Sequence, residues 1–290
     1  MSTKIHPTAV IAPGAELGVD VEIGPHTVVG PHVRIGDRSR IGPQVVLDGN
    51  TTLGADNLVV GQASLGGAPQ DLSYRGEATE LQIGDRNTVR EFVTINRGTL
   101  KGGGVTRIGS DCLLMACCHV AHDCALDDRV ILANGALLAG HVHVGRGASV
   151  SGASAVHHFV TIGEFAYIAG MSRLPQDVPP YMLVEGHPAR VRRVNDVGLE
   201  RAGFSEEEIE SLRRAHKRLW RSKTSEPRRQ VLRELREAPG ATRSVLTLVQ
   251  ALENTELGLK GRYRESLRAE YARQGRERIL GEVGEPSPSR

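Results

Sequence analysis

Residues 108–174 read IGSDCLLMACCHVAHDCALDDRVILANGALLAGHVHVGRGASVSGASAVHHFVTIGEFAYIAGMSRL. An aliphatic residue returns at every sixth position of this stretch, without a gap from Ile108 to Leu174. The same spacing governs residues 5–65 and, more briefly, residues 83–95. A short fixed period is the mark of a repeat architecture, in which each repeat buries its apolar side chains against the next.

The six-residue unit predicts a parallel β-helix. Four positions after each aliphatic residue comes a small or β-branched one, such as Ala9, Val21 or Thr27, so each rung carries one large and one small inward side chain. Three rungs make an 18-residue triangular coil, and each coil hydrogen-bonds to the next at about 4.8 Å. Aromatic residues are only 3% of the chain, which suits a core of aliphatic ladders.

The period divides the chain into three regions. We expect an all-β N-terminal domain over residues 1–190 and a small α-helical C-terminal domain over residues 191–258. Residues 259–290 form a charged, arginine-rich tail that we expect to be partly helical and frayed at its end.

Two interruptions of the period predict loops. Residues 66–80 place Asp71 and Glu77 where aliphatic residues should stand, and residues 96–107 put the count one residue out of phase. Three glycines, Gly102–Gly104, should make the second loop pliable. Because binding residues gather on loops carried by a rigid scaffold, both loops are candidates for gripping a ligand.

After residue 174 the pattern stops. Four prolines between residues 175 and 188 are expected to cap the coil and to block further strand pairing. Ser205 and Glu208 form a predicted capping box at the start of a helix. Further helices are expected over residues 226–238 and 242–254.

Composition narrows the possible partners and the location. The net charge of +2 and the pI near 8.4 are too mild to indicate a nucleic-acid partner. The chain shows neither a signal-peptide core nor about 18 consecutive apolar residues, so we expect no membrane span and a cytoplasmic location. Cys112, Cys118 and Cys124 fall on the small inward position, which favours core filling over a metal site.

Residues 18 apart stack directly above one another on such a coil. His122, Gly140 and His158 are related in this way, which predicts a cluster of imidazoles on one edge. Three more candidates are adjacent in sequence to members of this column. They are Asp123, His141 and His157. His119 lies shortly before them in the sequence.

Spacing alone leaves three interpretations open. His122 can act as a general base with Asp123 orienting its ring. Three neutral imidazoles can hold a zinc ion with an open position, as in the γ-class carbonic anhydrases, which use this same fold. The histidines can also be solvated edge residues without chemistry, on a structural or binding module.

The loops and the histidine run together resemble a known family. Residues 66–99, 109–144, 153–163 and 176–189 are similar to the UDP-N-acetylglucosamine O-acyltransferases that open lipid A biosynthesis, and the likeness extends over about residues 5–222. The H-x-x-H-D-C run at residues 119–124 is specific among hexapeptide-repeat proteins.

This resemblance implies a left-handed coil and a reaction without cofactor or metal. A 3-hydroxyacyl group would pass from acyl carrier protein to the 3-hydroxyl of UDP-N-acetylglucosamine by direct attack on the thioester. His122 matches the family's general base, Asp123 would hold its ring, and the N–H of Gly140 would donate to the oxyanion. A homotrimer is implied as well.

The resemblance also assigns substrate contacts. The positions matching those that bind sugar, nucleotide or acyl chain are Gln70 and Asp71 for the amino sugar, His119, His141, His157 and His158 for the nucleotide-sugar cleft, Asn195 and Arg201 near the diphosphate, and Gly170 at the end of the acyl groove. A glycine at 170 should admit a longer chain, of about C14. Basic residues near the coil's end are expected to dock the acidic carrier, namely Arg190, Arg192, Arg193 and Arg201.

Each substrate contact has a plainer alternative. Without the resemblance, Asp71 would be interpreted as a loop cap, Asn195 as a turn former and Arg201 as a solvated charge. The sequence also departs from better-known members, with Ser73 where Lys is frequent, Asn96 where some have His, and His158 where Gln is usual. These departures bear on sugar contact and on whether the acceptor carries a hydroxyl or an amine at its 3-position.

Overall fold

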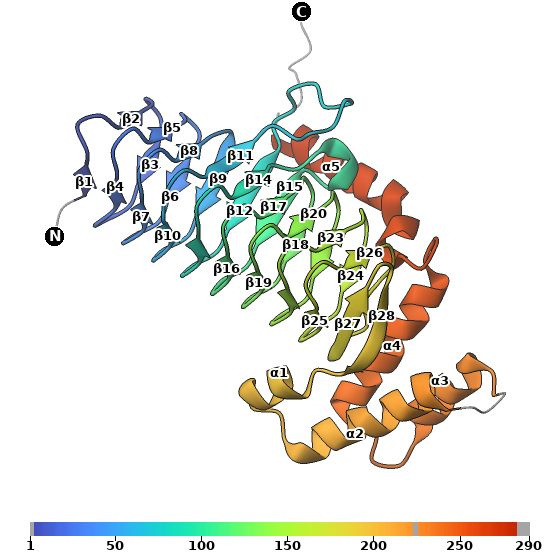
Figure 1. Cartoon of the computed structure of the whole chain (residues 1–290). Coiled ribbons are helices and arrows are strands. Elements are labelled where there is room, and N and C mark those ends of the chain that lie inside the picture. The colour runs from blue at the N-terminus through green and yellow to red at the C-terminus, as the bar shows by residue number, and fades with distance from the viewer. Residues whose placement is uncertain (1–2, 223–225, 283–290) are drawn as a thin grey trace, which may run out of the picture.

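The computed structural model describes residues 3–222 and 226–282 (Figure 1). The last part of the expected tail, residues 283–290, lies outside the described residues. Most of the chain is a three-sided parallel β-helix that leads into a helical domain, from which a last helix runs back beside the coil. Among the described residues there is no helix whose length and apolar character would allow it to cross a bilayer.

Each side of the coil is one sheet of short strands, here called sheets A, B and C. Sheet A contains, in spatial order, β1 (Lys4–Ile5), β4 (Glu22–Ile23), β7 (Arg40–Ile41), β10 (Leu58–Val59), β13 (Thr88–Val89), β16 (Leu113–Leu114), β19 (Ile131–Leu132), β22 (Ser149–Val150), β25 (Tyr167–Ile168), β27 (Met182–Gly186) and β28 (Ala189–Val194). Sheet B contains β2 (Val10–Ile11), β5 (Val28–Val29), β8 (Val46–Leu47), β11 (Ser64–Gly67), β14 (Thr94–Asn96), β17 (His119–Val120), β20 (Leu137–Leu138), β23 (Ala155–Val156) and β26 (Arg173–Leu174). Sheet C contains β3 (Glu16–Leu17), β6 (Arg34–Ile35), β9 (Asn50–Leu53), β12 (Glu80–Ile83), β15 (Val105–Ile108), β18 (Ala125–Leu126), β21 (His143–Val144) and β24 (Thr161–Ile162).

The expected register of the coil and its two inward positions are confirmed. Leu114 pairs with Leu132, its counterpart one coil later, and both are fully buried. The three cysteines on the small inward position, Cys112, Cys118 and Cys124, are buried in the same core. Burial also raises the pKa of the Cys118 thiol to about 12, which keeps the sulfur protonated as an apolar filler.

Both interruptions of the period leave the coil as loops, over residues 68–79 and 97–104. Leu58 pairs with Thr88, where an uninterrupted coil would bring Gly76, so the first loop lengthens its coil. Thr88 in turn pairs with Leu113, where an uninterrupted coil would bring Thr106, so the second loop does the same. The second loop contains a 3₁₀ turn, η1 (Leu100–Gly102), and packs on the coil, where Gly102 lies against Asp123.

The prediction that the prolines block further strand pairing is wrong. β27 continues sheet A parallel to β25, with Tyr167 opposite Leu183, and β28 turns back antiparallel to β27. Pro179 and Pro180 come before β27, so neither removes an N–H that its ladder needs. The two strands carry the sheet from the coil to the helical domain.

The helical domain has its own apolar core. Its helices are α1 (Asp196–Arg201), α2 (Glu206–His216), the π-helical turn η2 (Lys217–Arg221), α3 (Arg228–Glu237) and α4 (Arg243–Leu257). Ser205 and Glu208 form the capping box expected at the start of α2, and both of its reciprocal hydrogen bonds are present. Leu212, Leu232 and Leu248 are buried together between α2, α3 and α4.

The segment after α4 forms two helical elements. It forms η3 (Tyr263–Leu267) and α5 (Arg268–Glu282), and α5 lies beside the loop that contains η1 (Figure 1). The expectation of a partly helical tail understates this arrangement, because the helix contacts the coil.

Candidate active site

The site lies on the edge between sheets B and C, where the chain turns at the end of each rung. The repeat stacks two columns of side chains on this edge: His122, Gly140 and His158 in one, and Asp123, His141 and Phe159 in the other. All three members of the second column adopt the left-handed backbone conformation, with φ of 62° to 64°. The strict period therefore aligns three consecutive turns, as expected.

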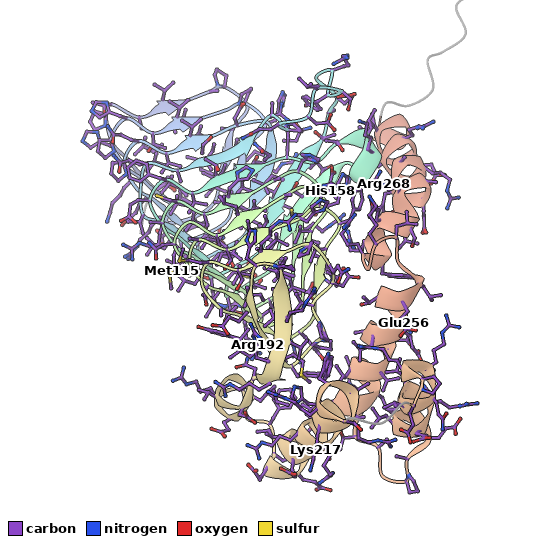
Figure 2. The ribbon with its side chains drawn as sticks, turned by 45° about the vertical axis from the view of Figure 1, so that its right-hand side comes forward. Met115, His158, Arg192, Lys217, Glu256 and Arg268 are labelled. Atoms are coloured by element: carbon purple, nitrogen blue, oxygen red, sulfur yellow. The ribbon has the colours of Figure 1, made fainter. Side chains whose placement is uncertain are left out.

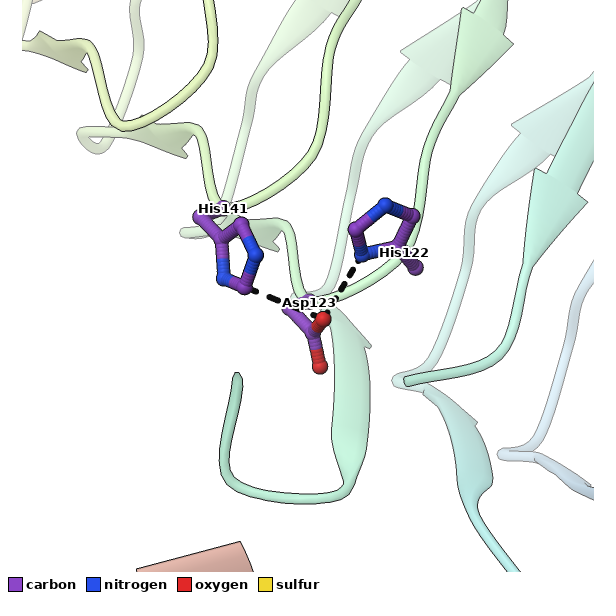
Figure 3. Close-up of side chains that lie close together, drawn as sticks. All are labelled: His122, Asp123 and His141. Carbon is purple, nitrogen blue, oxygen red and sulfur yellow. Dashed lines mark hydrogen bonds and ion pairs between the residues drawn. The ribbon is translucent and has the colours of Figure 1, made fainter. Parts of the chain in front are cut away.

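His122 and Asp123 form a hydrogen-bonded pair (Figure 3). The distance from Nδ1 of His122 to Oδ2 of Asp123 is 2.7 Å, and the side chains are 14% and 0% exposed. A neutral imidazole that donates from Nδ1 keeps Nε2 as the basic nitrogen. The pair therefore has the geometry of a base oriented by a carboxylate.

The second loop holds this carboxylate in place. Thr99 donates twice to Asp123, from its N–H at 2.7 Å and from its hydroxyl at 2.6 Å. The N–H of Asp123 donates to the hydroxyl of Thr106 at 2.8 Å. Gly102 packs so closely that a Cβ there would lie 1.9 Å from Cγ of Asp123. The loop thus excludes water from the carboxylate of Asp123 and donates two hydrogen bonds that stabilise its buried charge.

Gly140 lies directly against the imidazole of His122. A Cβ at this position would lie 2.6 Å from Cε1 and 2.8 Å from Nε2 of that ring, so the close contact requires glycine. Within residues 3–222 and 226–282 its N–H meets no hydrogen-bond acceptor. An unpaired N–H beside a basic nitrogen is a suitable donor for a developing oxyanion.

His141 is a neutral neighbour of the pair. Its Nδ1 lies 3.8 Å from Oδ2 of Asp123, and its ring stacks on Phe159 with centroids 4.2 Å apart. Burial lowers the pKa of His141 to about 4, a shift that Asp123 opposes and that His122 and two arginines reinforce. At neutral pH it therefore remains uncharged and contributes shape and hydrogen-bonding groups.

A pocket of about 420 Å³ opens over this edge. It is lined by His122, Gly140, His141, His158, Phe159, Ala139, Asp71, Lys101, Arg268 and Ala272. Asp71 comes from the first loop, where the N–H and hydroxyl of Ser73 bond to its carboxylate and lower its pKa. A larger cleft of about 1010 Å³ between sheet C and the helical domain contains neither His122 nor Asp123.

Two predicted residues lie beside the pocket without lining it. His119 bonds through Nδ1 to the hydroxyl of Thr94 at 2.8 Å, and burial lowers its pKa. His157 packs against His158 with ring centroids 3.9 Å apart, and it donates from Nδ1 to the carbonyl of His158 at 3.2 Å. Burial, followed by His157, lowers the pKa of His158.

Within a single chain, four predicted residues are not brought to the pocket. Gln70 is exposed on the first loop. Asn195 caps α1, since its side chain accepts from the N–H of Gly198 and donates to the carbonyl of Phe165. Arg201 is exposed at the end of α1. Gly170 lies on the edge between sheets A and B, a different corner of the prism from His122.

Sequence reasoning missed several residues of the site. Thr99 carries the most important hydrogen bonds to Asp123, but it lies in the out-of-phase loop, whose path the repeat does not define. Phe159 could have been found, because it stands one full coil after His141 in the same column. Arg268 lies in the C-terminal segment, outside the six-residue repeat, so the repeat could not indicate its place at the pocket.

The zinc interpretation called for three neutral imidazoles, whereas the group of possible metal ligands found among the described residues is two histidines and one carboxylate. The ligating atoms of His122, Asp123 and His141 lie within 4.8 Å of one another. Both oxygens of Asp123 already accept hydrogen bonds, from Thr99 and from His122. This arrangement fits a hydrogen-bonded base better than a metal ligand set.

Comparisons with known proteins agree with this coil. A family model described as UDP N-acetylglucosamine O-acyltransferase, domain 2, matches residues 177–260, and a model of the bacterial transferase hexapeptide (six repeats) matches residues 20–49. A Gloeothece citriformis protein named acyl-[acyl-carrier-protein]–UDP-N-acetylglucosamine O-acyltransferase is 47% identical, over 92% of this chain and 89% of that protein. A Burkholderia lata protein of the same name is 47% identical, over 89% of this chain and 99% of that protein.

Solved structures show the same likeness. UDP-N-acetylglucosamine acyltransferase from Campylobacter jejuni aligns with a TM-score of 0.80 and 40% identity, covering 86% of this chain and 96% of that one. The Francisella novicida acyltransferase aligns with a TM-score of 0.82 and 32% identity, covering 86% and 91%. The coil is thus a left-handed parallel β-helix, and the chain is an acyltransferase that belongs to the UDP-N-acetylglucosamine O-acyltransferase family.

Proposed function

We propose that this chain transfers a 3-hydroxyacyl group from acyl carrier protein to the 3-hydroxyl of UDP-N-acetylglucosamine, with His122 as general base. The names of its relatives support the two substrates. The observation that carries the mechanism is the His122–Asp123 pair beside the unpaired N–H of Gly140, on the wall of one pocket.

The reaction needs one proton carrier and one oxyanion donor. Nε2 of His122 takes the proton of the sugar hydroxyl while that oxygen attacks the thioester carbonyl, and the buried carboxylate of Asp123 stabilises the imidazolium. The carbonyl oxygen becomes an oxyanion that accepts from the N–H of Gly140. The tetrahedral intermediate then collapses, the carbon–sulfur bond breaks, and the imidazolium returns the proton to the leaving thiolate. No acyl-enzyme forms.

We further propose that the working enzyme is a homotrimer. Sheet B presents an outward row of apolar side chains, including Val10, Val28, Val46 and Leu137, which a neighbouring subunit would cover. The same sheet separates the edge of Gly170 from the edge of His122. An acyl chain that leaves the pocket along a subunit interface would reach Gly170 of a neighbouring subunit, and there the missing side chain leaves room for about C14.

The acidic carrier would dock at the end of the coil. Arg190, Arg192 and Arg193 are exposed on β28. Arg192 and Arg193 are partly neutralised by Glu185 at 3.4 Å and Asp196 at 3.6 Å. Charge reversal at Arg190 should therefore raise the apparent KM for the carrier more than reversal at either paired arginine.

One experiment tests the function and the base. Purified protein is incubated with UDP-N-acetylglucosamine and a 3-hydroxyacyl carrier, and O-acylated sugar is measured by mass spectrometry. We expect product from the wild type, a loss of about a hundredfold to ten-thousandfold in His122→Ala, and normal activity in His143→Ala, which changes an outward-facing histidine of sheet C. Absence of wild-type product would refute the function, and an active His122→Ala would refute the mechanism. Stoichiometric zinc with chelator-sensitive activity would instead revive the metal interpretation.

A further inference from the structure

We propose that α5, which follows η3, completes the active-site pocket and that Arg268 binds a phosphate group of one of the substrates there. This inference rests on the proposed function and adds a substrate contact to it. The family model that matches residues 177–260 ends before both elements.

The segment is fastened to the coil at three points. Tyr263 donates its N–H to Oδ2 of Asp177 at 2.8 Å, and Nη1 of Arg262 bonds the carbonyl of Pro175 at 2.8 Å. At the other end, Nη2 of Arg278 lies 2.7 Å from Oε1 of Glu80 on β12. These contacts hold the segment along the edge that carries the site (Figure 2).

Between these points the helix packs backbone against backbone. Gly275 is buried, and a Cβ there would lie 2.1 Å from the carbonyl oxygen of Leu100 in η1. The loop that contains η1 also carries Thr99, which holds the carboxylate of Asp123, and Lys101, which lines the pocket. The helix therefore docks on the element that orients the proposed base.

Arg268 lies at the pocket wall in a prepared position. Its Cζ lies 4.5 Å from the ring centroid of Phe159, and its Nη2 lies 2.8 Å from Oε1 of Glu265. The other oxygen of Glu265 pairs with Arg262. Figure 2 shows Arg268 beside His158. The side chain is 53% exposed, so a guanidinium fixed at two points still presents N–H groups to the pocket.

The charges around the pocket suit an anion. Its lining carries two cations, Lys101 and Arg268, against one carboxylate, Asp71. Lys101 pairs with Asp71 at 3.5 Å, and His141 is neutral at physiological pH, so Arg268 supplies the excess positive charge of the lining. Guanidinium groups match phosphate geometry. Both proposed substrates contain phosphate, as the diphosphate of the nucleotide sugar and as the phosphodiester of the carrier's pantetheine arm, so the two sources must be separated by experiment.

The test compares Arg268→Gln with Arg276→Gln, which removes an exposed arginine of the same helix that does not line the pocket. We expect Arg268→Gln to raise KM for one substrate about five- to twentyfold with kcat within about twofold, because one partly solvated charged contact is lost. The substrate whose KM rises identifies the phosphate. Arg276→Gln should leave both KM values unchanged. Gly275→Ala, which should lift the helix from η1, should raise the same KM as Arg268→Gln.

Binding measurements keep the test independent of turnover. Calorimetric titration of the full chain with UDP-N-acetylglucosamine alone and with 4′-phosphopantetheine alone should show a matching rise in one Kd for Arg268→Gln. The proposal is wrong if Arg268→Gln changes neither KM value and neither Kd value. It is also wrong if Arg268→Gln and Gly275→Ala both raise kcat, because the helix would then obstruct the pocket. If the wild type makes no product but binds one of the two compounds more tightly than Arg268→Gln does, the proposed reaction is refuted and the proposed contact of Arg268 is supported.

Discussion

Replacing Gly140 by alanine should disable the proposed base while leaving every hydrogen-bonding group of His122 and Asp123 in the chain. The new Cβ would lie 2.6 Å from Cε1 and 2.8 Å from Nε2 of His122, whereas ordinary carbon contacts begin at about 3.4 Å. The ring must therefore move by about 0.6 to 0.8 Å or rotate away from Asp123. A displacement of this size at the reacting atom costs about a hundredfold in rate, or about 3 kcal/mol in the activation free energy.

The assay is steady-state acyl transfer with both substrates saturating, and thermal unfolding is recorded in parallel. We expect kcat of Gly140→Ala to fall about a hundredfold while the melting temperature changes little, because the clash is with a side chain at a half-open edge. The matched control is Gly152→Ala, at the corresponding turn of another edge, where the nearest atom to a new Cβ is the carbonyl oxygen of Asn134 at 3.2 Å. Alanine keeps the backbone N–H at 140, so a kcat within about threefold of wild type would refute the close packing of the imidazole as a requirement of catalysis.

Three further changes test other parts of the structure. Thr99→Val removes one of the two hydrogen bonds that Thr99 donates to the buried carboxylate of Asp123 and should lower kcat about tenfold, whereas Thr52→Val on the outer face of sheet C should not change it. Because the pKa of His141 is lowered to about 4 in the fold and is near 6.5 in an unfolded chain, the free energy of unfolding should fall as pH drops from 6.5 toward 4, by up to about 3 kcal/mol. Denaturant titrations of His141→Asn should show a flatter pH dependence in that window, and an unchanged slope would contradict the assignment. Leu132→Ala should lower the free energy of unfolding by about 2 to 5 kcal/mol. Ile131→Ala changes the neighbouring outward-facing residue and should lower it by less than about 1 kcal/mol.

The coil was predictable because its contacts are periodic. Once every sixth residue points inward, each residue's neighbour is its counterpart one coil further along the chain, and the pairing of Leu114 with Leu132 follows. The stacking of His122 beneath Gly140 follows by the same count. Contacts between successive coils can thus be predicted by counting a fixed number of residues along the sequence, which is unusual for a β structure.

The remaining contacts had no such rule. The pairing of β27 with β25 depends on where the chain returns after Pro180, and the docking of α5 depends on a close contact between Gly275 and Leu100, which are far apart in the sequence. Neither element repeats a pattern found elsewhere in the chain. Shape complementarity between two particular surfaces decides these contacts, and a single sequence shows no period from which to infer it.

The repeat alone does not account for a buried carboxylate. Asp56 and Asp111 occupy left-handed turn positions of the coil, as Asp123 does, yet their side chains are 39% and 43% exposed and pair with arginines. Asp123 is 0% exposed because the inserted residues of the second loop fold over it and donate two hydrogen bonds from Thr99. A carboxylate in a dry, hydrogen-bonded setting can fix and stabilise an imidazolium, whereas one exposed to water and paired with arginine cannot. The interruption of the repeat, more than the repeat itself, therefore distinguishes this turn from the others and makes it a site for proton transfer.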